Sequence, residues 1–425
     1  MPLSEESPPK YAIDGETSTT TVVQVPEQEA TTENSETHHQ PEKDGNDHKP
    51  KTALQAILSS FKAILFATWL NLLLICVPIG IAAGYADWND VAVFFINFAA
   101  IIPLAKLLGF ATEELALRTN ETIGGLLNAS FGNAVELIIG ILAVKDNLIR
   151  IVQASIIGSI LSNLLLVLGF CFFFGGLRYR EQKFNKDVAS TSTSLLAVTS
   201  LVFLLPAAFF YQLEAENNEY SDQKVLNMSR GVSIVLLIVY GCYLYFQLRT
   251  HSDLFTDVAK AETGEEEEGE EPQLTPIVAV ILLVVSTVFV ALCAESLVGS
   301  IEGLSKQWGL TESFVGLVLL PIVGNAAEHL TAVSVAMKNK MDLSIGVAVG
   351  SSLQIALLVA PVLVIIAWIT NVPLTLDFTI FEVAVSFVCV FIVNALIADG
   401  KSNWLEGALL LGAYLVVAIA FFFLP

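Results

Sequence analysis

Long apolar runs separated by short polar stretches dominate the chain from residue 62 onward. A helix needs about 20 residues to cross a hydrocarbon layer about 30 Å thick. Membrane-barrel strands would be about ten residues long, with strict alternation that these runs lack. We therefore predict an all-α integral membrane protein. Its roughly eleven transmembrane helices should lie near 63–85, 92–116, 122–144, 149–176, 189–213, 231–250, 275–300, 312–337, 342–370, 378–398 and 402–424.

The polar stretches divide the chain into four regions. Residues 1–61 form an acidic tail without apolar periodicity, which predicts disorder. Residues 62–250 hold one extra helix and a first group of five, and residues 275–425 hold a second group of five. Residues 251–274 form an acidic linker between the two groups, which we expect in the cytosol.

Composition and charge narrow the class of protein. The chain is 54% hydrophobic and only 15% charged, against about 25% charged in a typical globular domain. This excludes a soluble enzyme and makes the lipid bilayer a partner. The net charge of −21 argues against nucleic acid. Five scattered cysteines predict small core residues without disulfides. The sequence leaves the oligomeric state open.

An internal repeat relates the two groups of helices. Residues 132–169 and 324–361 align without a gap over 38 positions, offset by 192, with 11 identities that include a shared G-N-A-x-E motif. The motifs fall in the third and eighth segments, so they should run in opposite directions across the membrane. Such inverted repeats are typical of secondary transporters, which bind substrate on broken helices at the midplane. The expected helix breakers are Gly132, Gly158, Gly169, Pro321, Gly324, Gly350 and Pro361.

The repeat carries two carboxylates into the membrane, Glu136 and Glu328. A charge at the centre of a spanning helix costs about 2.5 kcal/mol or more, so each should face a partner or an aqueous cavity. Six polar residues accompany them at matching positions: Asn133, Asn325, Ser159, Ser162, Ser351 and Gln354. Pairing of the glutamates with lysine is the competing interpretation, but no lysine stands nearby in the sequence. Each Ser or Gln could also serve as a hydrogen bond between helices.

The chemistry of this set predicts a cation substrate. Its ligands are all oxygen, which suits Ca²⁺. Mn²⁺ also accepts oxygen and stays open, whereas a soft metal is disfavoured without cysteine. We expect no resident cofactor and no enzymatic activity. Two opposed carboxylates can carry two protons in place of one divalent cation, which would enforce exchange. His329 replaces the Leu137 of the first motif and is either a proton acceptor or a hydrogen bond between helices.

The remaining acids lie at the segment ends and in the linker. We expect Glu113, Glu114 and Glu295 to be solvated at the membrane edge. The run at 257–271 is either a solvated connector or a cytosolic cation sensor built on Glu265, Glu266, Glu267 and Glu268.

The two G-N-A-x-E motifs, the acidic linker and the six-plus-five segments resemble the cation/proton exchanger family of the Ca²⁺/cation antiporter superfamily, close to its fungal vacuolar Ca²⁺/H⁺ exchangers. The resemblance covers roughly residues 55–425. It implies a multi-pass antiporter of the vacuolar membrane that exchanges cytosolic Ca²⁺ for lumenal H⁺ by alternating access. It also implies that Glu136 and Glu328 bind cation and proton in turn, with the six polar residues supplying neutral oxygens.

The resemblance and the loop charges also suggest orientation and coupling. Ten basic loop residues against five place the N-terminus in the cytosol, and eleven spans then put the C-terminus in the lumen. A sodium-coupled exchanger of the same superfamily would need further Na⁺ ligands, where Leu137 and His329 stand. A cation channel should show pore signals rather than an inverted repeat.

Overall fold

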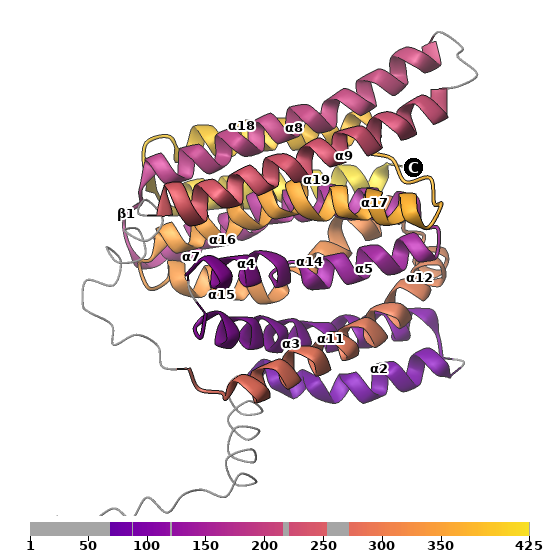
Figure 1. The fold of residues 1–425 in the computed structure, drawn as a ribbon, viewed down its shortest axis with the longest axis horizontal. Helices are drawn as coiled ribbons and strands as arrows, with labels where there is room; N and C mark the ends of the chain where they lie inside the picture. The colour runs from indigo at the N-terminus through magenta and orange to yellow at the C-terminus, as the bar shows by residue number, and fades with distance from the viewer. Residues whose placement is uncertain (1–68, 87, 120, 216–220, 253–271, 425) are drawn as a thin grey trace, which may run out of the picture. The chain divides into compact units, whose positions relative to one another are not determined.

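The computed structural model describes residues 69–86, 88–119, 121–215, 221–252 and 272–424, all within one compact unit. These residues are mostly helical, as the apolar runs predict (Figure 1). The tail at 1–61 and most of the acidic linker lie outside the described residues, so their predicted disorder stays a prediction.

The first half of the described chain is built from helical segments in close succession. They are η1 (Trp69–Ile75), α2 (Cys76–Tyr85), α3 (Asp90–Ala116), α4 (Glu121–Phe131), α5 (Ala134–Lys145), α6 (Ile149–Leu161), η2 (Ser162–Val167), α7 (Leu168–Arg178), α8 (Lys186–Ala215), α9 (Ser221–Tyr245) and η3 (Phe246–Thr250).

The second half follows the same plan after the linker. Its segments are α11 (Pro276–Gly299), α12 (Ile301–Trp308), α13 (Glu312–Phe314), η4 (Val315–Leu319), α14 (Leu320–Gly324), α15 (Ala326–Ala336), α16 (Met341–Gln354), η5 (Ile355–Val359), α17 (Ala360–Ile369), α18 (Ile380–Ile397) and α19 (Trp404–Phe423). Two short strands, β1 (Gln182–Lys183) and β2 (Lys401–Ser402), pair antiparallel between the halves.

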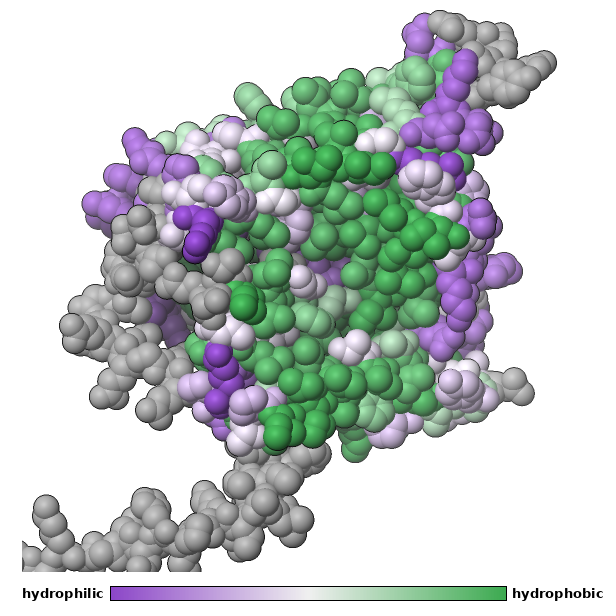
Figure 2. All heavy atoms as spheres, in the orientation of Figure 1, coloured by the Kyte–Doolittle hydropathy of each residue, from purple (hydrophilic) through white to green (hydrophobic). Residues whose placement is uncertain are grey.

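Within the described residues, eight helices are long and apolar enough to cross a membrane. A ninth span is bent by 60° between Glu312–Gly324 and Ala326–Ala336, and a shorter apolar helix covers Leu70–Tyr85. Large side chains such as Ile277 and Val416 are exposed on the outside. Figure 2 shows a broad apolar face of the molecule with hydrophilic groups on both sides of it. A surface of this kind needs lipid, so the protein is an integral membrane protein.

The helices that carry the repeat form the interior. In the span from Ile149 to Arg178, 83% of the most apolar 18-residue stretch is buried. In the span Trp404–Phe423 the corresponding share is 22%. Around this centre α3 packs on α11, α7 on α19, α8 on α18 and α9 on α17. Figure 1 shows α2, α3 and α11 side by side at one edge.

The third predicted segment is not one continuous helix. It divides into α4 and α5 at Gly132 and Asn133, and the eighth divides into α14 and α15 at Asn325. The count of eleven spans therefore stays a prediction.

Other expected breakers were wrong. The residues that lie inside continuous helical stretches are Gly158, Gly169, Pro321, Gly350 and Pro361. Gly158 instead admits close approach, because a Cβ there would overlap the backbone of Leu317. Cys242 also departs from its prediction, since it is exposed rather than part of the core.

Candidate functional site

The site begins at the two breaks in the repeat helices. Asn133 has φ −100° and ψ 24°, and Asn325 has φ −96° and ψ 6°, so the same residue of each motif leaves helical geometry in the same way. A new helix starts directly afterwards, and Glu136 and Glu328 lie in the first turns of α5 and α15. The N-terminus of a helix carries partial positive charge, which stabilises a carboxylate placed there.

The two copies share local structure well beyond the motif. Asn147 and Asn339, an identity of the repeat, both adopt a left-handed backbone with φ of 58° and 63°. The same 192-residue offset relates the π-helical segment η5 to residues 163–167 of η2. Wide π turns break regular bonding and are frequent at functional sites. Each copy therefore brings a broken helix and a widened helix to the same region.

The structure brings the two glutamates together. A methyl group placed on Gly324 would lie 3.0 Å from Glu136 Oε1, and one on Gly132 would lie 3.6 Å from Glu328 Oε1. Each carboxylate therefore rests on the glycine of the other motif. At Gly324 a methyl group would press on the Glu136 carboxylate, whereas at Gly132 it would meet Asn128 O at 2.8 Å and only touch Glu328.

A chain of hydrogen bonds joins the neutral residues of both copies. Asn133 Nδ2 donates to Gln354 Oε1 at 2.5 Å, and Ser351 Oγ donates to Asn133 Oδ1 at 3.2 Å. An asparagine at a helix start usually caps its own helix. Asn133 makes no such cap and holds the opposite repeat instead. Four predicted residues thus occupy one neighbourhood, because Gln354 Oε1 also lies 3.7 Å from a methyl group placed on Gly132, beside Glu328.

Asn163 belongs to the same chain of hydrogen bonds and was not predicted from the sequence. Its Nδ2 donates to Ser351 Oγ at 3.0 Å, and the side chain is buried. Its counterpart at the 192-residue offset is Ile355, so the repeat did not single it out. An amide directly after Ser162 in an otherwise apolar run was the available signal.

The other predicted residues lie nearby with different partners. Ser162 Oγ lies 3.5 Å from His329 Nε2, which links the two repeats a second time. Asn325 Nδ2 donates to Pro321 O at 3.2 Å within its own broken helix. Ser159 is buried and lines a pocket together with Glu136.

Four acceptor atoms of this site are buried without a hydrogen-bond partner. They are Glu136 Oε1 and Oε2, Glu328 Oε2 and Asn325 Oδ1. Buried polar groups are normally hydrogen-bonded, because an unpaired one loses its water without compensation. No lysine or arginine forms an ion pair with either glutamate within the described residues. The unpaired oxygens fit a cation or protons as the missing partner.

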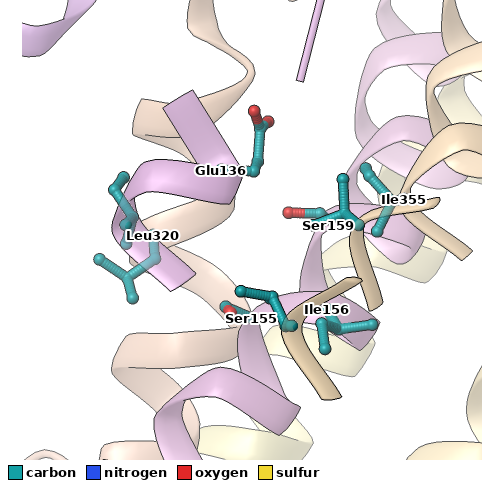
Figure 3. A pocket seen from close by; sticks show the side chains of 9 residues that line it. Glu136, Ser155, Ile156, Ser159, Leu320 and Ile355 are labelled. Carbon is teal, nitrogen blue, oxygen red and sulfur yellow. The ribbon is translucent and has the colours of Figure 1, made fainter. Parts of the chain in front are cut away.

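A narrow pocket with about 20 Å³ of free volume lies beside Glu136 (Figure 3). Glu136, Ser155 and Ser159 are its polar lining, and apolar side chains of α5, α6, α14, η5 and α17 complete it. In Figure 3 the Ser159 hydroxyl points toward the helix that carries Glu136. Ser155 lies one helical turn from Ser159, toward the start of α6, so the pocket extends along α6 from the carboxylate.

One of the three acids expected to be solvated at the membrane edge is not. Glu114 is buried rather than solvated, and its carboxylate accepts the backbone N–H groups of Gln273 and Leu274 at 3.0 and 2.8 Å. Arg118 donates to Leu274 O from the same end of α3. These contacts attach the chain leaving the acidic linker to α3. Glu295 is half exposed, as expected, and pairs with Lys145 at 3.0 Å. Glu265, Glu266, Glu267 and Glu268 lie outside the described residues.

Comparison with known proteins gives consistent matches across the helical part of the chain. The family described as "Sodium/calcium exchanger protein" matches residues 89–249 and 278–423. A "Vacuolar calcium ion transporter" of Schizosaccharomyces pombe is 48% identical over 374 residues, covering 88% of this chain and 89% of the relative. A "Ca(2+)/H(+) antiporter" of Aphanothece halophytica is 48% identical over 361 residues, covering 83% and 96%. The solved structure of native YfkE superposes with a TM-score of 0.72 at 39% identity, covering 84% of this chain and all of that one.

Proposed function

The chain belongs to the sodium/calcium exchanger protein family, and from that premise we propose that it is a secondary antiporter that exchanges Ca²⁺ for H⁺ across a vacuolar membrane. Similar proteins named as a vacuolar calcium ion transporter and a Ca²⁺/H⁺ antiporter match along nearly their whole lengths. A transporter role also fits an apolar helical body with polar oxygens gathered in its interior.

One observation carries the mechanism that we propose: the carboxylates of Glu136 and Glu328 face each other's motifs with unpaired buried oxygens. Two ionised carboxylates at close range in a poorly hydrated site repel each other strongly. A divalent cation cancels their two charges, and two protons do the same. Asn133, Asn325, Ser159, Ser162, Ser351 and Gln354 would add neutral oxygens, as Ca²⁺ prefers six to eight.

This arrangement makes exchange obligatory. The Ca²⁺-loaded and doubly protonated forms are both near neutral, so both can reorient across the membrane. The empty form carries two uncompensated charges at mid-membrane and is strongly disfavoured. A ligand shifts a conformational equilibrium only through its differential affinity for the states. Neither ion can then leak alone, because the carrier returns only when loaded.

Proton rather than sodium coupling is supported by the residues beside the glutamates. Leu137 and His329 stand where additional oxygen ligands for Na⁺ would be needed, and His329 Nε2 lies 3.5 Å from Ser162 Oγ. A histidine can accept a proton near neutral pH. We therefore propose His329 as a third proton-coupling group. Mn²⁺ accepts the same oxygen ligands and would be a second substrate.

The proposed architecture has two inverted five-helix repeats after one additional N-terminal helix. Equal backbone geometry at Asn133 and Asn325, and at Asn147 and Asn339, supports common descent of the two halves. The N-terminus would lie in the cytosol and the C-terminus in the lumen, in keeping with the loop charges. The linker acids Glu265–Glu268 would then bind Ca²⁺ on the cytosolic side and regulate transport.

Ca²⁺ uptake into proteoliposomes with an acidic interior tests the proposal. The wild-type protein should accumulate Ca²⁺ under an imposed pH gradient and not under a Na⁺ gradient. Glu136→Gln and Glu328→Gln should each abolish uptake while remaining folded, because one neutral amide leaves a charge uncompensated. Glu302→Gln is a matched control, because Glu302 is an exposed acid whose ion pair with Lys306, at 2.5 Å, lies on the surface. Robust uptake by either site variant would refute the mechanism.

In the same assay, neutralising Glu265–Glu268 should change activation by cytosolic Ca²⁺ without abolishing uptake.

A further inference from the structure

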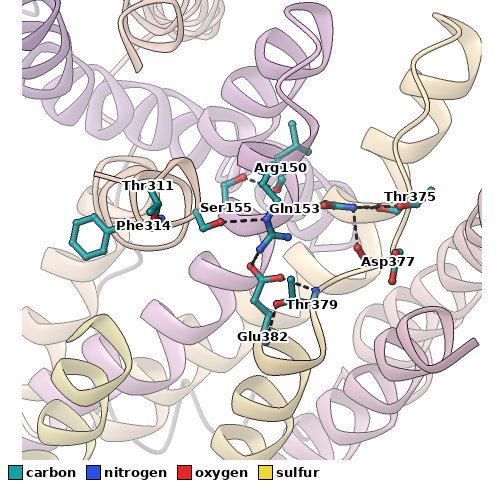
Figure 4. Close-up of polar contacts among 11 residues, drawn as sticks. Arg150, Gln153, Ser155, Thr311, Phe314, Thr375, Asp377, Thr379 and Glu382 are labelled. Carbon is teal, nitrogen blue, oxygen red and sulfur yellow. Dashed lines mark hydrogen bonds and ion pairs between the residues drawn. The ribbon is translucent and has the colours of Figure 1, made fainter. Parts of the chain in front are cut away.

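Arg150 joins three helices at the end of the molecule where α6 and α13 begin, which we call the Arg150 end. Its guanidinium pairs with Glu382 Oε1 at 2.5 Å, and its Nε donates to Ser313 Oγ at 3.2 Å (Figure 4). These three residues, Arg150, Ser313 and Glu382, form the Arg150 cluster. They belong to α6, α13 and α18, so the cluster connects the first repeat region to the second.

Glu382 makes the cluster a buried one. Its side chain is fully buried, and its second carboxylate oxygen accepts the backbone N–H of Thr379 at 2.9 Å within the cap of α18. A buried charge that loses its partner is strongly unfavourable. Gln153, one turn after Arg150, adds hydrogen bonds to Thr375 O and Asp377 O at 3.1 and 3.0 Å. The start of α6 is therefore firmly attached at this end.

Below the cluster, α6 and η4 pack backbone against backbone. A Cβ on Gly316 would lie 2.9 Å from Ala154 Cβ and 2.9 Å from Ile151 O, and a Cβ on Gly158 would overlap Leu317 O. η4 leads through α14 to Asn325 and Glu328, and α6 carries Ser159. Contact between these segments therefore closes the site along one side of its path toward the Arg150 end.

The positions related by the 192-residue offset are arranged differently. Gly350, the counterpart of Gly158, has open space beside it, with no atom beyond its own turn of helix within 4 Å of a Cβ placed there. Gly124, the counterpart of Gly316, approaches Ala116 O of α3 instead of α16. Asp342, an acid, stands where Arg150 is a base, and its Oδ1 accepts the backbone N–H of Asn185. One structure thus holds the two related helix pairs in a closed and an open arrangement.

We propose that the Arg150 cluster is the latch that holds the Arg150 end closed, and that it must separate when the ion path opens toward that end. This role rests on the proposed alternating access, since only a carrier that opens at each end in turn needs a closure that can be released. Arg150 is a positioning residue, because it contacts α13 and α18 and not the carboxylates of Glu136 or Glu328.

The accessibility of Ser155 provides a direct readout of this closure. Ser155 of α6 and Leu320 of α14 line the same pocket, so separation of these helices should expose Ser155. The reporter is Ser155→Cys, a nearly isosteric change, in a background with the accessible Cys76 and Cys242 replaced by serine. Its reaction with a membrane-impermeant maleimide is followed from the Arg150 end in oriented proteoliposomes.

Arg150→Gln and Glu382→Gln should each raise the labelling rate several-fold. Both should also weaken the apparent Ca²⁺ affinity measured from the opposite end by a similar factor, because the competent population falls. Glu382→Gln preserves the helix cap, since glutamine fills the same position, so the test does not depend on the folding of Arg150→Gln. Lys145→Gln is the matched control: it removes a half-exposed ion pair at the same end and should label like wild type.

Labelling at the wild-type rate in both cluster variants would overturn the latch, as would an equal increase in Lys145→Gln. Thermal melting in detergent identifies a variant whose labelling reflects unfolding. The labelling needs no transport, so its outcome is separate from that of the proposed function. Absence of pH-driven uptake by the wild-type protein would remove the exchange proposal while labelling still reports on the closure.

Discussion

At the scale of single residues, the candidate site combines two buried glutamates with a hydrogen bond from Asn163 to Ser351 that joins the two repeats. Glu136 and Glu328 are acids in apolar helices with a shared motif, which physical cost alone makes conspicuous. Asn163 has no polar counterpart in the second repeat and looks like one more amide in a helix. Its bond to Ser351 depends on how η2 and α16 are packed, which a single sequence does not specify.

Asn163 should matter through the orientation of Ser351. Asn163→Ala removes the donor that holds Ser351 Oγ, which in turn donates to Asn133 Oδ1. A hydrogen bond of this kind contributes about 0.5–1.5 kcal/mol. We therefore expect the apparent Ca²⁺ affinity to weaken by roughly two- to tenfold, with the maximal rate less affected. Initial rates of Ca²⁺ uptake at graded Ca²⁺ concentrations measure both quantities.

Ser352→Ala is the control for this prediction. Ser352 is buried next to Ser351 but donates to Ala348 O of its own helix at 3.0 Å. Its removal should leave the Ca²⁺ affinity near that of wild type. An equal loss in both variants would mean that the effect comes from packing of α16 rather than from the orientation of Ser351.

At the scale of elements, the apolar runs located the helices, but of the predicted interruptions only those at Gly132 and Gly324 adjoin a break. Every predicted segment contains helix in the described residues, because a long apolar run in lipid must pair its backbone N–H and C=O groups internally, as a helix does. Where a helix breaks depends on the surroundings: Gly132 adjoins a break, whereas Gly158 allows contact inside a continuous helix. Glycine in a sequence permits either outcome, so only the packing decides between them.

Gly158 and Gly350 offer a matched pair of substitutions at equivalent repeat positions. Gly158→Ala would force a methyl group into the backbone of Leu317, and overpacking of this kind costs about 1–3 kcal/mol. Gly350→Ala meets open space, and alanine favours a helix over glycine by up to about 1 kcal/mol. We expect Gly158→Ala to lower the melting temperature in detergent and Gly350→Ala to keep or raise it. The opposite order would show that α6 and η4 are not closely packed.

At the scale of the whole molecule, the architecture explains why two separate stretches of sequence form one site. Residues near 133 and near 325 are distant in the chain but meet because α6 packs against η4 and α14. The repeat made this meeting predictable, since two related halves place equivalent residues around one axis. The acidic linker joins the halves, and Glu114 attaches its exit to α3. Transport and regulation would thus share a physical connection through that helix.

The number of protons exchanged per Ca²⁺ equals the number of groups in the whole site that release a proton when Ca²⁺ binds and take one up when it leaves. If Glu136 and Glu328 are the only such groups, two protons would be exchanged for each Ca²⁺, in an electroneutral cycle. Each proton moving down one pH unit supplies about 1.4 kcal/mol, so two protons support about a hundredfold Ca²⁺ gradient per pH unit. A third proton on His329 would raise this limit to about a thousandfold at zero potential. It would also move one net charge, worth about 2.3 kcal/mol per 100 mV.

Measuring the limiting Ca²⁺ gradient at a fixed pH difference, with and without a potassium diffusion potential, therefore separates the two cycles. If His329 carries a proton, the wild-type gradient should respond to the potential and His329→Ala should remove that response while retaining uptake. If the limiting Ca²⁺ gradient does not change with the potential in either the wild-type protein or His329→Ala, Glu136 and Glu328 would be the complete proton-coupling set. His329 would then act only through its contact with Ser162, and its substitution should alter cation affinity rather than stoichiometry.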